Sequence, residues 1–412
     1  MSWPQSLLTR RNALLFLAGI FFLIAWNREV NLLYGMFALI SATVIVSVVL
    51  PRFALNGIEA FRTLPAAAFE GEEIEISVTM ANRGRASRFM VEAVDAVPAA
   101  PPHEREPLVF AGRLAGGEKR SFTYRLPCYK RGFYSVGPLR LRSAYPLGIA
   151  WSEREGDPSL PTLQVYPSMF EITSFPLLAT GSLVASGMES LARAGGSDDF
   201  FGTREYRRGD SLRHIHWPST ARHDRLIVKE FEVRASTEAT LLLDLHRDAD
   251  PGEERESVLE YSVRIAASIA GYALGRGHTV QLAGFADEPH LVAPGRGRHH
   301  LALLLDALAR VAGGGAVPYH EAMVRAADLL RDGSTAVLFF CGGESVEEYL
   351  YPLGILRAKR VRPVAVYFER ESFSGGFSFC RPEEEPLARE LLAMGVPVYF
   401  VARGSDLREL FQ

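Results

Sequence analysis

The residues most able to do covalent chemistry are one cysteine and a few histidines, and their spacing matches no catalytic motif. Cys341 ends an apolar run (Thr335 to Cys341) and could act as a nucleophile beside a histidine. A buried structural thiol is the simpler interpretation, because the sequence places no base next to it. The sequence contains no G-x-S-x-G elbow, H-E-x-x-H helix or glycine-rich phosphate loop. We therefore expect a protein that is not an enzyme.

A dense polar segment from residue 202 to residue 232 is the most distinctive part of the chain. Arginines alternate there with carboxylates, and Tyr206, Ile215 and Trp217 are expected to be buried among them. Because arginine forks pair well with carboxylates, the segment is predicted to clasp the region that follows it. A surface for a partner protein and a phosphate or nucleic-acid site are the alternatives, the second weakened by the interleaved acids. The candidate residues are Arg204, Tyr206, Gly209, Asp210, Arg213, His216, Trp217, Arg222, Lys229 and Glu230.

The region after this segment alternates between strands and helices. Apolar runs at 239–245, 335–341 and 364–368 are typical of parallel strands buried on both faces. Two more strands are expected at 278–286 and 397–401. Five helices are expected at 253–276, 299–311, 319–330, 345–360 and 383–394. This order predicts a doubly wound α/β sheet, whose ligand sites lie at the carboxyl ends of the strands.

The region before the segment has the period of two that indicates strands. Short strands are expected at 72–80, 89–97, 120–126, 139–141 and 162–166. Their spacing predicts an antiparallel β-sandwich over residues 56–167. The stretch 180–197, with Gly181, Gly187, Gly195 and Gly196, is predicted to be a mobile linker. The α/β part, including the polar segment, is then expected to span 195–412.

Two charge-free apolar stretches, 13–26 and 32–50, lie near the N-terminus. Since a spanning helix needs about 20 residues, we predict a transmembrane helical hairpin over residues 12–50. A signal peptide and a hairpin buried in a globular core are the alternatives. Arg10 and Arg11 precede the hairpin, and Arg52 and Arg62 follow it. The positive-inside rule thus predicts a multi-pass protein of the inner (plasma) membrane with its soluble domains in the cytoplasm.

The amino-acid composition argues against several classes of protein. Lysine and arginine total 45 and aspartate and glutamate total 48, a net charge of -3 that does not favour a nucleic-acid partner. Three cysteines are too few for a disulfide framework or a four-cysteine zinc site.

The polar segment resembles the signature of a bacterial family called domain of unknown function 58. The matching positions are Arg204, Tyr206, Gly209, Asp210, Arg213, Ile215, Trp217, Ala221, Arg222 and Lys229 to Glu232. The N-terminal hairpin, Arg131 to Tyr134, Gly137-Pro138 and Pro146 to Gly148 extend the resemblance over nearly the whole chain. The resemblance implies a von Willebrand factor A-like domain after the signature and a frequent association with a MoxR-type AAA+ ATPase.

A von Willebrand factor A domain can hold a divalent cation through Asp-x-Ser-x-Ser, so the resemblance also suggests where a metal would bind. The equivalent residues are Asp244, His246 and Asp248, which are possible metal ligands although the serine hydroxyls are lost. Cys341 stands where a further aspartate is expected. We expect no cofactor here and a structural or interaction loop instead.

The expected function is a membrane-anchored scaffold or adaptor that presents the α/β domain to a MoxR-type AAA+ ATPase. A metal-dependent adhesion-type binding module and a hydrolase or transferase that uses Cys341 are the alternatives.

Overall fold

The computed structural model describes residues 10–177, 200–206, 212, 215–223, 225–231, 238–342, 345–376 and 382–412. The chain forms two compact units. The first contains Met1–Phe170, Glu253–Ala267 and Leu305–Ala312, and the second contains Glu171–Gly252, Ser268–Leu304 and Gly313–Gln412. The predicted linker at 180–197 lies outside the described residues.

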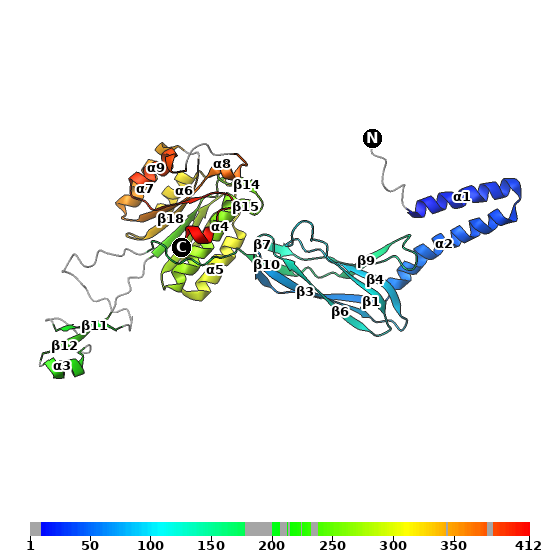
Figure 1. Ribbon diagram of the computed structural model, residues 1–412, viewed down its shortest axis with the longest axis horizontal. Helices are drawn as coiled ribbons and strands as arrows, with labels where there is room; N and C mark the ends of the chain where they lie inside the picture. The colour runs from blue at the N-terminus through cyan, green and yellow to red at the C-terminus, as the bar shows by residue number, and fades with distance from the viewer. Residues whose placement is uncertain are drawn as a thin grey trace. The chain divides into compact units, whose positions relative to one another are not determined.

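Two helices begin the first unit. Helix α1 spans Arg10–Arg28 and helix α2 spans Asn31–Leu55. The rings of Phe22 and Phe37 have their centroids 5.0 Å apart, and the helices lie side by side (Figure 1). Within the described part of the chain, α2 is the one helix that is long and apolar enough to cross a membrane.

Ten strands follow in the first unit. They are β1 (Ile58–Thr63), β2 (Ala67–Phe69), β3 (Glu73–Asn82), β4 (Arg88–Val94), β5 (Leu108–Leu114), β6 (Lys119–Pro127), β7 (Gly132–Ser135), β8 (Leu139–Ser143), β9 (Ser152–Asp157) and β10 (Thr162–Tyr166). Their sheets have the orders β1-β3-β6, β2-β10-β7 and β5-β4-β8-β9. All five predicted strands are present, as β3, β4, β6, β8 and β10. The wholly antiparallel arrangement is wrong, because β10 runs parallel to β2.

Strand β3 contributes residues to the two apolar cores of this unit. Ile76 belongs to a cluster that includes Val165 of β10. Farther along the strand, Val78 and Met80 belong to a second cluster that includes Leu141 of β8. Successive side chains on a strand point to opposite faces, so each inward residue of β3 meets one of these clusters.

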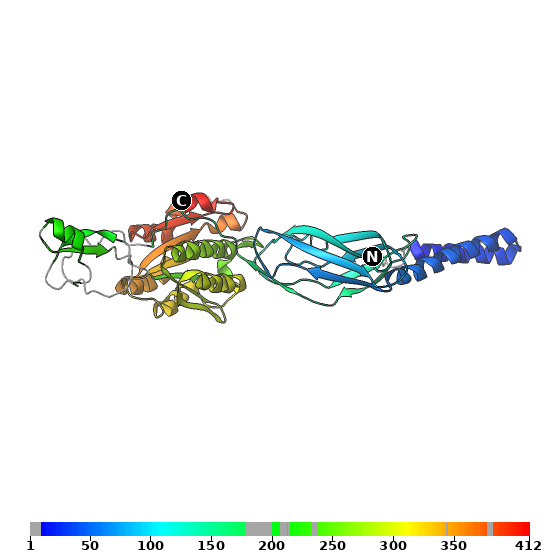
Figure 2. The ribbon, with the colours of Figure 1, turned by 90° about the horizontal axis from the view of Figure 1, so that it is seen from below.

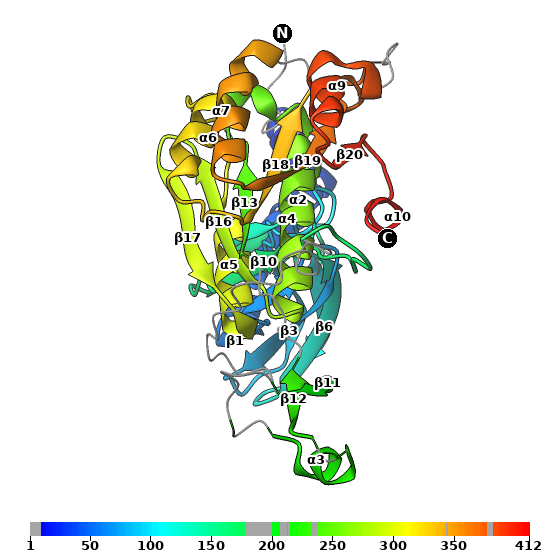
Figure 3. The ribbon, with the colours of Figure 1, turned by 90° about the vertical axis from the view of Figure 1, so that its left-hand side faces the viewer.

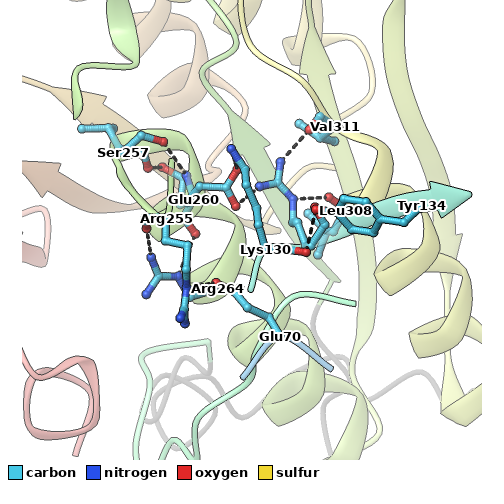
Figure 4. A network of polar contacts seen from close by, with 12 residues as sticks. Glu70, Lys130, Tyr134, Arg255, Ser257, Glu260, Arg264, Leu308 and Val311 are labelled. Atoms are coloured by element: carbon cyan, nitrogen blue, oxygen red, sulfur yellow. Dashed lines mark hydrogen bonds and ion pairs between the residues drawn. The ribbon is translucent and has the colours of Figure 1, made fainter. Parts of the chain in front are cut away.

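A buried polar network connects the strand region of the first unit to its two later segments, Glu253–Ala267 and Leu305–Ala312 (Figure 4). The Arg131 guanidinium forms an ion pair with Glu260, and both side chains are at most 4% exposed. Arg131 also donates to the carbonyl of Leu308 at 2.9 Å and to that of Val311 at 2.5 Å. Lys130 Nζ adds a contact of 3.3 Å to Glu260. Two cations therefore contact the buried Glu260 carboxylate, and such pairing offsets the cost of burying a charge.

A six-stranded sheet forms the centre of the second unit (Figure 2). Its strands are β13 (Glu238–Leu243), β16 (Thr279–Phe285), β17 (Pro289–Gly295), β18 (Thr335–Cys341), β19 (Arg362–Phe368) and β20 (Val398–Val401). Their order is β17-β16-β13-β18-β19-β20, and all neighbours pair in parallel except β16 and β17. Strand β17 was not expected from the sequence, because it lies at the edge of the sheet, has no fully buried residue and contains two prolines.

Helices join these strands in the predicted order. They are α4 (Val258–Gly275), α5 (Gly297–Arg310), α6 (Tyr319–Ala327), α7 (Val346–Ala358), α8 (Arg370–Phe373), α9 (Pro386–Ala393) and α10 (Leu407–Leu410). Helix α4 begins five residues later than the predicted start at 253, because the short strands Gly252–Glu253 and Glu256–Ser257 pair with each other first. Helices α6, α7 and α9 pack on one face of the sheet, where their apolar residues share a core with β18 and β19 (Figure 3).

Candidate functional site at the carboxyl edge of the sheet

The strand order creates one position in the second unit where a ligand or partner site is expected. Strands β13 and β18 are neighbours, and the chain continues from them toward opposite edges of the sheet. At such a switch point the loops after the two strands diverge and leave a crevice. The residues that follow the strands are Asp244 after β13, Gly342 after β18 and Glu369 after β19.

Tyr319 spans the point where β13 and β18 separate. Its hydroxyl donates to the carbonyl of Leu242 at 2.7 Å and accepts from the N–H of Phe339 at 2.9 Å. The side chain is 2% exposed, so these two contacts satisfy backbone groups that water cannot reach. Sequence reasoning missed this positioning residue; the signal available was a tyrosine at the start of a predicted helix.

A small pocket opens at this edge, with a volume of about 190 Å³. It is lined by His246, Asp248, Ala249, Pro318, Tyr319, His320, Glu348, Tyr349 and Arg370. His320 Nδ1 lies 3.3 Å from Glu348 Oε2 across its rim. The volume is below the roughly 300–1,000 Å³ of typical small-molecule pockets. The mixed charges of the rim suit contact with a complementary protein surface better than enclosure of a ligand.

The three residues considered as metal ligands serve the loop itself. Asp244 Oδ1 accepts the backbone N–H of His246 at 2.9 Å, and the His246 ring accepts that of Asp248 at 3.4 Å. The Asp248 side chain is 73% exposed, with Oδ2 3.9 Å from His246 Nδ1. Across the described residues, no group of three or more His, Cys, Asp and Glu side chains is arranged to hold a metal ion.

Cys341 is a buried thiol at the end of β18, as the simpler interpretation predicts. Its Sγ lies 4.0 Å from an Arg370 guanidinium nitrogen. A cation at this distance would stabilise a thiolate, but the 1% exposure leaves little room for a substrate.

Two carboxylates meet beside the switch point. The Tyr367 hydroxyl donates to Glu385, and an added Cβ on Gly342 would lie 2.9 Å from the same carboxylate. A larger residue at 342 would therefore require the Glu385 carboxylate to shift. Burial raises the pKa of Glu369, and the negative charge of Glu385 raises this pKa further.

The polar signature forms a small hairpin with one helix. Strand β11 (Phe200–Glu205) pairs antiparallel with β12 (Ile227–Phe231), and α3 spans Trp217–His223. Ile215 bridges to Val228, and both side chains are buried. Thr220 Oγ1 accepts the N–H of Ile227 at 3.0 Å, which ties α3 to β12.

The predicted signature residues fall into three groups. Tyr206 and His216 are half-buried, and His216 Nδ1 lies 2.7 Å from Ser219 Oγ. Arg222 is exposed, and the backbone of Arg204, Lys229 and Glu230 lies in the two strands. Gly209, Asp210 and Arg213 lie outside the described residues.

The expectation that Trp217 is buried is wrong, since its side chain is 65% exposed. Trp217 is the first residue of α3, and the hairpin contacts are made instead by Ile215, His216 and Thr220. The buried residues described in this element are Ile215, Ile227 and Val228.

Most of the signature hairpin and most of the sheet fall in a recognised sequence region. Residues 202–364 match the model of a family described as "Protein of unknown function DUF58". These residues belong to the DUF58 family. The DUF58 region begins in β11 and ends in β19, so it includes the signature, the switch point and every lining residue of the 190 Å³ pocket except Arg370. No curated protein matches the sequence.

Some solved structures share a local likeness with the chain. The CARDB domain of a Pyrococcus furiosus protein is 9% identical over 26% of this chain and 86% of its own, with a TM-score of 0.18. A β-glucosidase from Listeria innocua is 18% identical over 24% of this chain and 16% of its own, with a TM-score of 0.15. A Vibrio harveyi exo-β-N-acetylglucosaminidase is 7% identical over 27% of this chain and 18% of its own, with a TM-score of 0.19. Scores this low say nothing about function here.

Proposed function

We propose that the protein is a membrane-anchored adaptor that presents the carboxyl edge of its six-stranded sheet to a partner protein. The carrying observation is the charged rim at the switch point, where His320, Glu348 and Arg370 surround a pocket too small for a typical ligand. The mostly parallel sheet with helices between its strands supports the von Willebrand factor A-like fold that the family resemblance implies. That resemblance also names the partner class, a MoxR-type AAA+ ATPase.

The anchor in this proposal is a transmembrane hairpin made of α1 and α2. The length and apolar character of α2 support it. The charges at the ends of the two helices, Arg10 and Arg11 at the start of α1 and Arg52 near the end of α2, favour a cytoplasmic location for both ends. Carbonate-washed membranes should retain the full chain. Protease added to intact spheroplasts should leave the chain after Leu55 uncut, and cleavage there would reverse the orientation.

Affinity purification of the full chain from detergent-solubilised membranes, followed by mass spectrometry, tests the partner. Glu348→Lys reverses the charge on the pocket rim, where the side chain is 55% exposed. Glu409→Lys makes the same change on α10, away from the pocket, and is the matched control. We expect an AAA+ ATPase with the parent and the control, and about tenfold less with Glu348→Lys, the scale for losing a charged contact. Recovery of no ATPase with the parent would overturn the proposal.

A further inference from the structure

A second and larger cavity lies at the amino ends of β19 and β20. Its volume is about 470 Å³. It is lined by Pro176, Leu353, Arg357, Arg360, Val361, Arg362, Pro363, Val364, Met394, Gly395, Val396 and Pro397. The volume falls within the roughly 300–1,000 Å³ of small-molecule pockets. The lining combines eight apolar side chains with three arginines and contains no acidic side chain.

The three arginines are not used by the described fold. Lys359, from the same run of sequence, donates to the carbonyl of Ala327 at 2.6 Å and so helps hold the end of α7. In contrast, no described residue forms a hydrogen bond or ion pair with the guanidinium of Arg357, Arg360 or Arg362. A cation near a helix C-terminus complements the helix dipole, which accounts for Arg357 but not for Arg362 at the start of β19.

Arg360 also stands where the backbone favours glycine. After α7, Val361 N–H bonds to Leu356 O at 2.9 Å and Arg360 N–H bonds to Arg357 O at 3.0 Å. This double bond pattern is a Schellman cap, which puts the residue after the cap in the left-handed region. The φ of Arg360 is 57°. Arginine is disfavoured there because its Cβ crowds the following carbonyl.

Helix α9 ends with the same cap and lines the same cavity. Val396 N–H bonds to Leu391 O at 3.0 Å and Gly395 N–H bonds to Leu392 O at 3.0 Å. Here the left-handed residue is glycine, Gly395, with a φ of 74°. Two equivalent caps therefore face one cavity, and only one carries a strained arginine. The cap itself does not require an arginine, and a non-glycine residue held in this conformation marks a candidate functional position.

We propose that this cavity binds a phosphomonoester, with its phosphate held by Arg357, Arg360 and Arg362 and its carbon body on the apolar lining. Guanidinium forks match the oxygens of a phosphate bidentately. A phosphomonoester near pH 7 carries about -1.5 to -2 charges and three terminal oxygens, which suits three guanidinium groups better than a carboxylate does. The carbon body is either a soluble metabolite or the glycerol backbone of a lipid.

Calorimetric titration of the full chain in uncharged detergent micelles tests this site. Phenyl phosphate represents the soluble source, and dioctanoyl phosphatidic acid represents the lipid source, with dioctanoyl phosphatidylcholine as its control. Saturable binding of either phosphomonoester supports the proposal, and the tighter one identifies the source. We expect inorganic phosphate to bind more weakly than either, because it leaves the apolar lining uncovered. No saturable binding of either phosphomonoester up to about 10 mM, the weak limit of specific affinity, would overturn the site.

The decisive variant is Arg360→Gly, which copies the cap of α9. It removes one guanidinium and relieves the left-handed strain, so the protein should melt at the same or a higher temperature while its affinity falls about tenfold. Arg389→Ala removes the same charge from the exposed face of α9 outside the cavity, and should bind like the parent. If Arg360→Gly binds like the parent, the cavity is not a phosphate site.

Discussion

Arginines occur in two contrasting settings in this protein. In the first unit Arg131 is buried, and its guanidinium is shared between Glu260 and two backbone carbonyls (Figure 4). In the second unit Arg357, Arg360 and Arg362 are exposed around a cavity and have no described partner. A buried charge must be neutralised by the fold, whereas an exposed one keeps its donors available to a ligand. The comparison distinguishes an arginine that stabilises the folded chain from arginines that are available to bind the proposed phosphate ligand.

The largest stability effect should come from Glu260→Gln. The substitution leaves the Arg131 guanidinium buried without a counter-charge, which costs roughly 3–5 kcal/mol. Thermal unfolding of the full chain in detergent would show this loss. Glu253→Gln, an exposed position a few residues earlier, should leave the melting temperature unchanged. A Glu260→Gln protein that melts like the parent would contradict the role assigned to the network.

Arg255→Ala should have an intermediate effect. Arg255 Nε lies 2.9 Å from Glu70 Oε1, and the Glu70 side chain is 0% exposed against 33% for Arg255. Loss of the arginine strands a buried carboxylate, which costs about 1.5–3 kcal/mol. Arg125→Ala breaks an exposed pair with Glu75 at 3.1 Å and should cost less than about 1 kcal/mol. If both variants lost the same free energy of unfolding in a urea titration, burial would not determine how much these ion pairs stabilise the protein.

Reciprocal exchanges at the two helix caps should have smaller and opposite effects. Arg360→Gly should raise the free energy of unfolding by about 0.5–1 kcal/mol, because glycine accepts the left-handed backbone. Gly395→Arg should lower it by a similar amount, since an added Cβ there meets no atom within 4 Å and only the backbone conformation is penalised. Chemical denaturation of both variants would measure these two changes in the free energy of unfolding. A loss of stability in Arg360→Gly would mean that the arginine holds the fold.

The smallest effect concerns pH and the like-charged carboxylates at the carboxyl edge. Burial and Glu385 raise the pKa of Glu369 in the folded chain, so the native state binds more protons than the unfolded state. Stability should therefore fall as the pH rises from about 4.3, the unfolded pKa of glutamate, through the raised folded pKa. Glu369→Gln should flatten this part of the melting-temperature profile. The control variant Asp406→Asn, at an exposed site, should give the same profile as the parent. A parent-like slope in Glu369→Gln would contradict the assignment.

Local sequence patterns predicted most of the secondary structure. The apolar run Thr335–Cys341 is a strand over the same residues, because a central parallel strand is buried on both faces and reads as continuous hydrophobicity. The alternation that predicted β3 reflects its period of two. The strands that were missed include β1, β2, β5, β7 and β9 in the first unit and β11, β12 and β17 in the second. Strand β2 has only three residues, and much of β17 is exposed.

The sequence by itself determined the family signature, the apolar N-terminal helix and the alternation of strands and helices in the second unit. Each of these depends on residue types at short spacing, which a linear pattern records. Only the tertiary structure decided that Tyr319 closes the switch point, that Glu260 is the partner of Arg131, and that Trp217 is exposed. Likewise, the equivalence of Arg360 and Gly395 appears only when two helix ends separated by 35 positions meet at one cavity. These facts depend on contacts between distant segments, and burial and pairing are properties of such contacts rather than of any single residue.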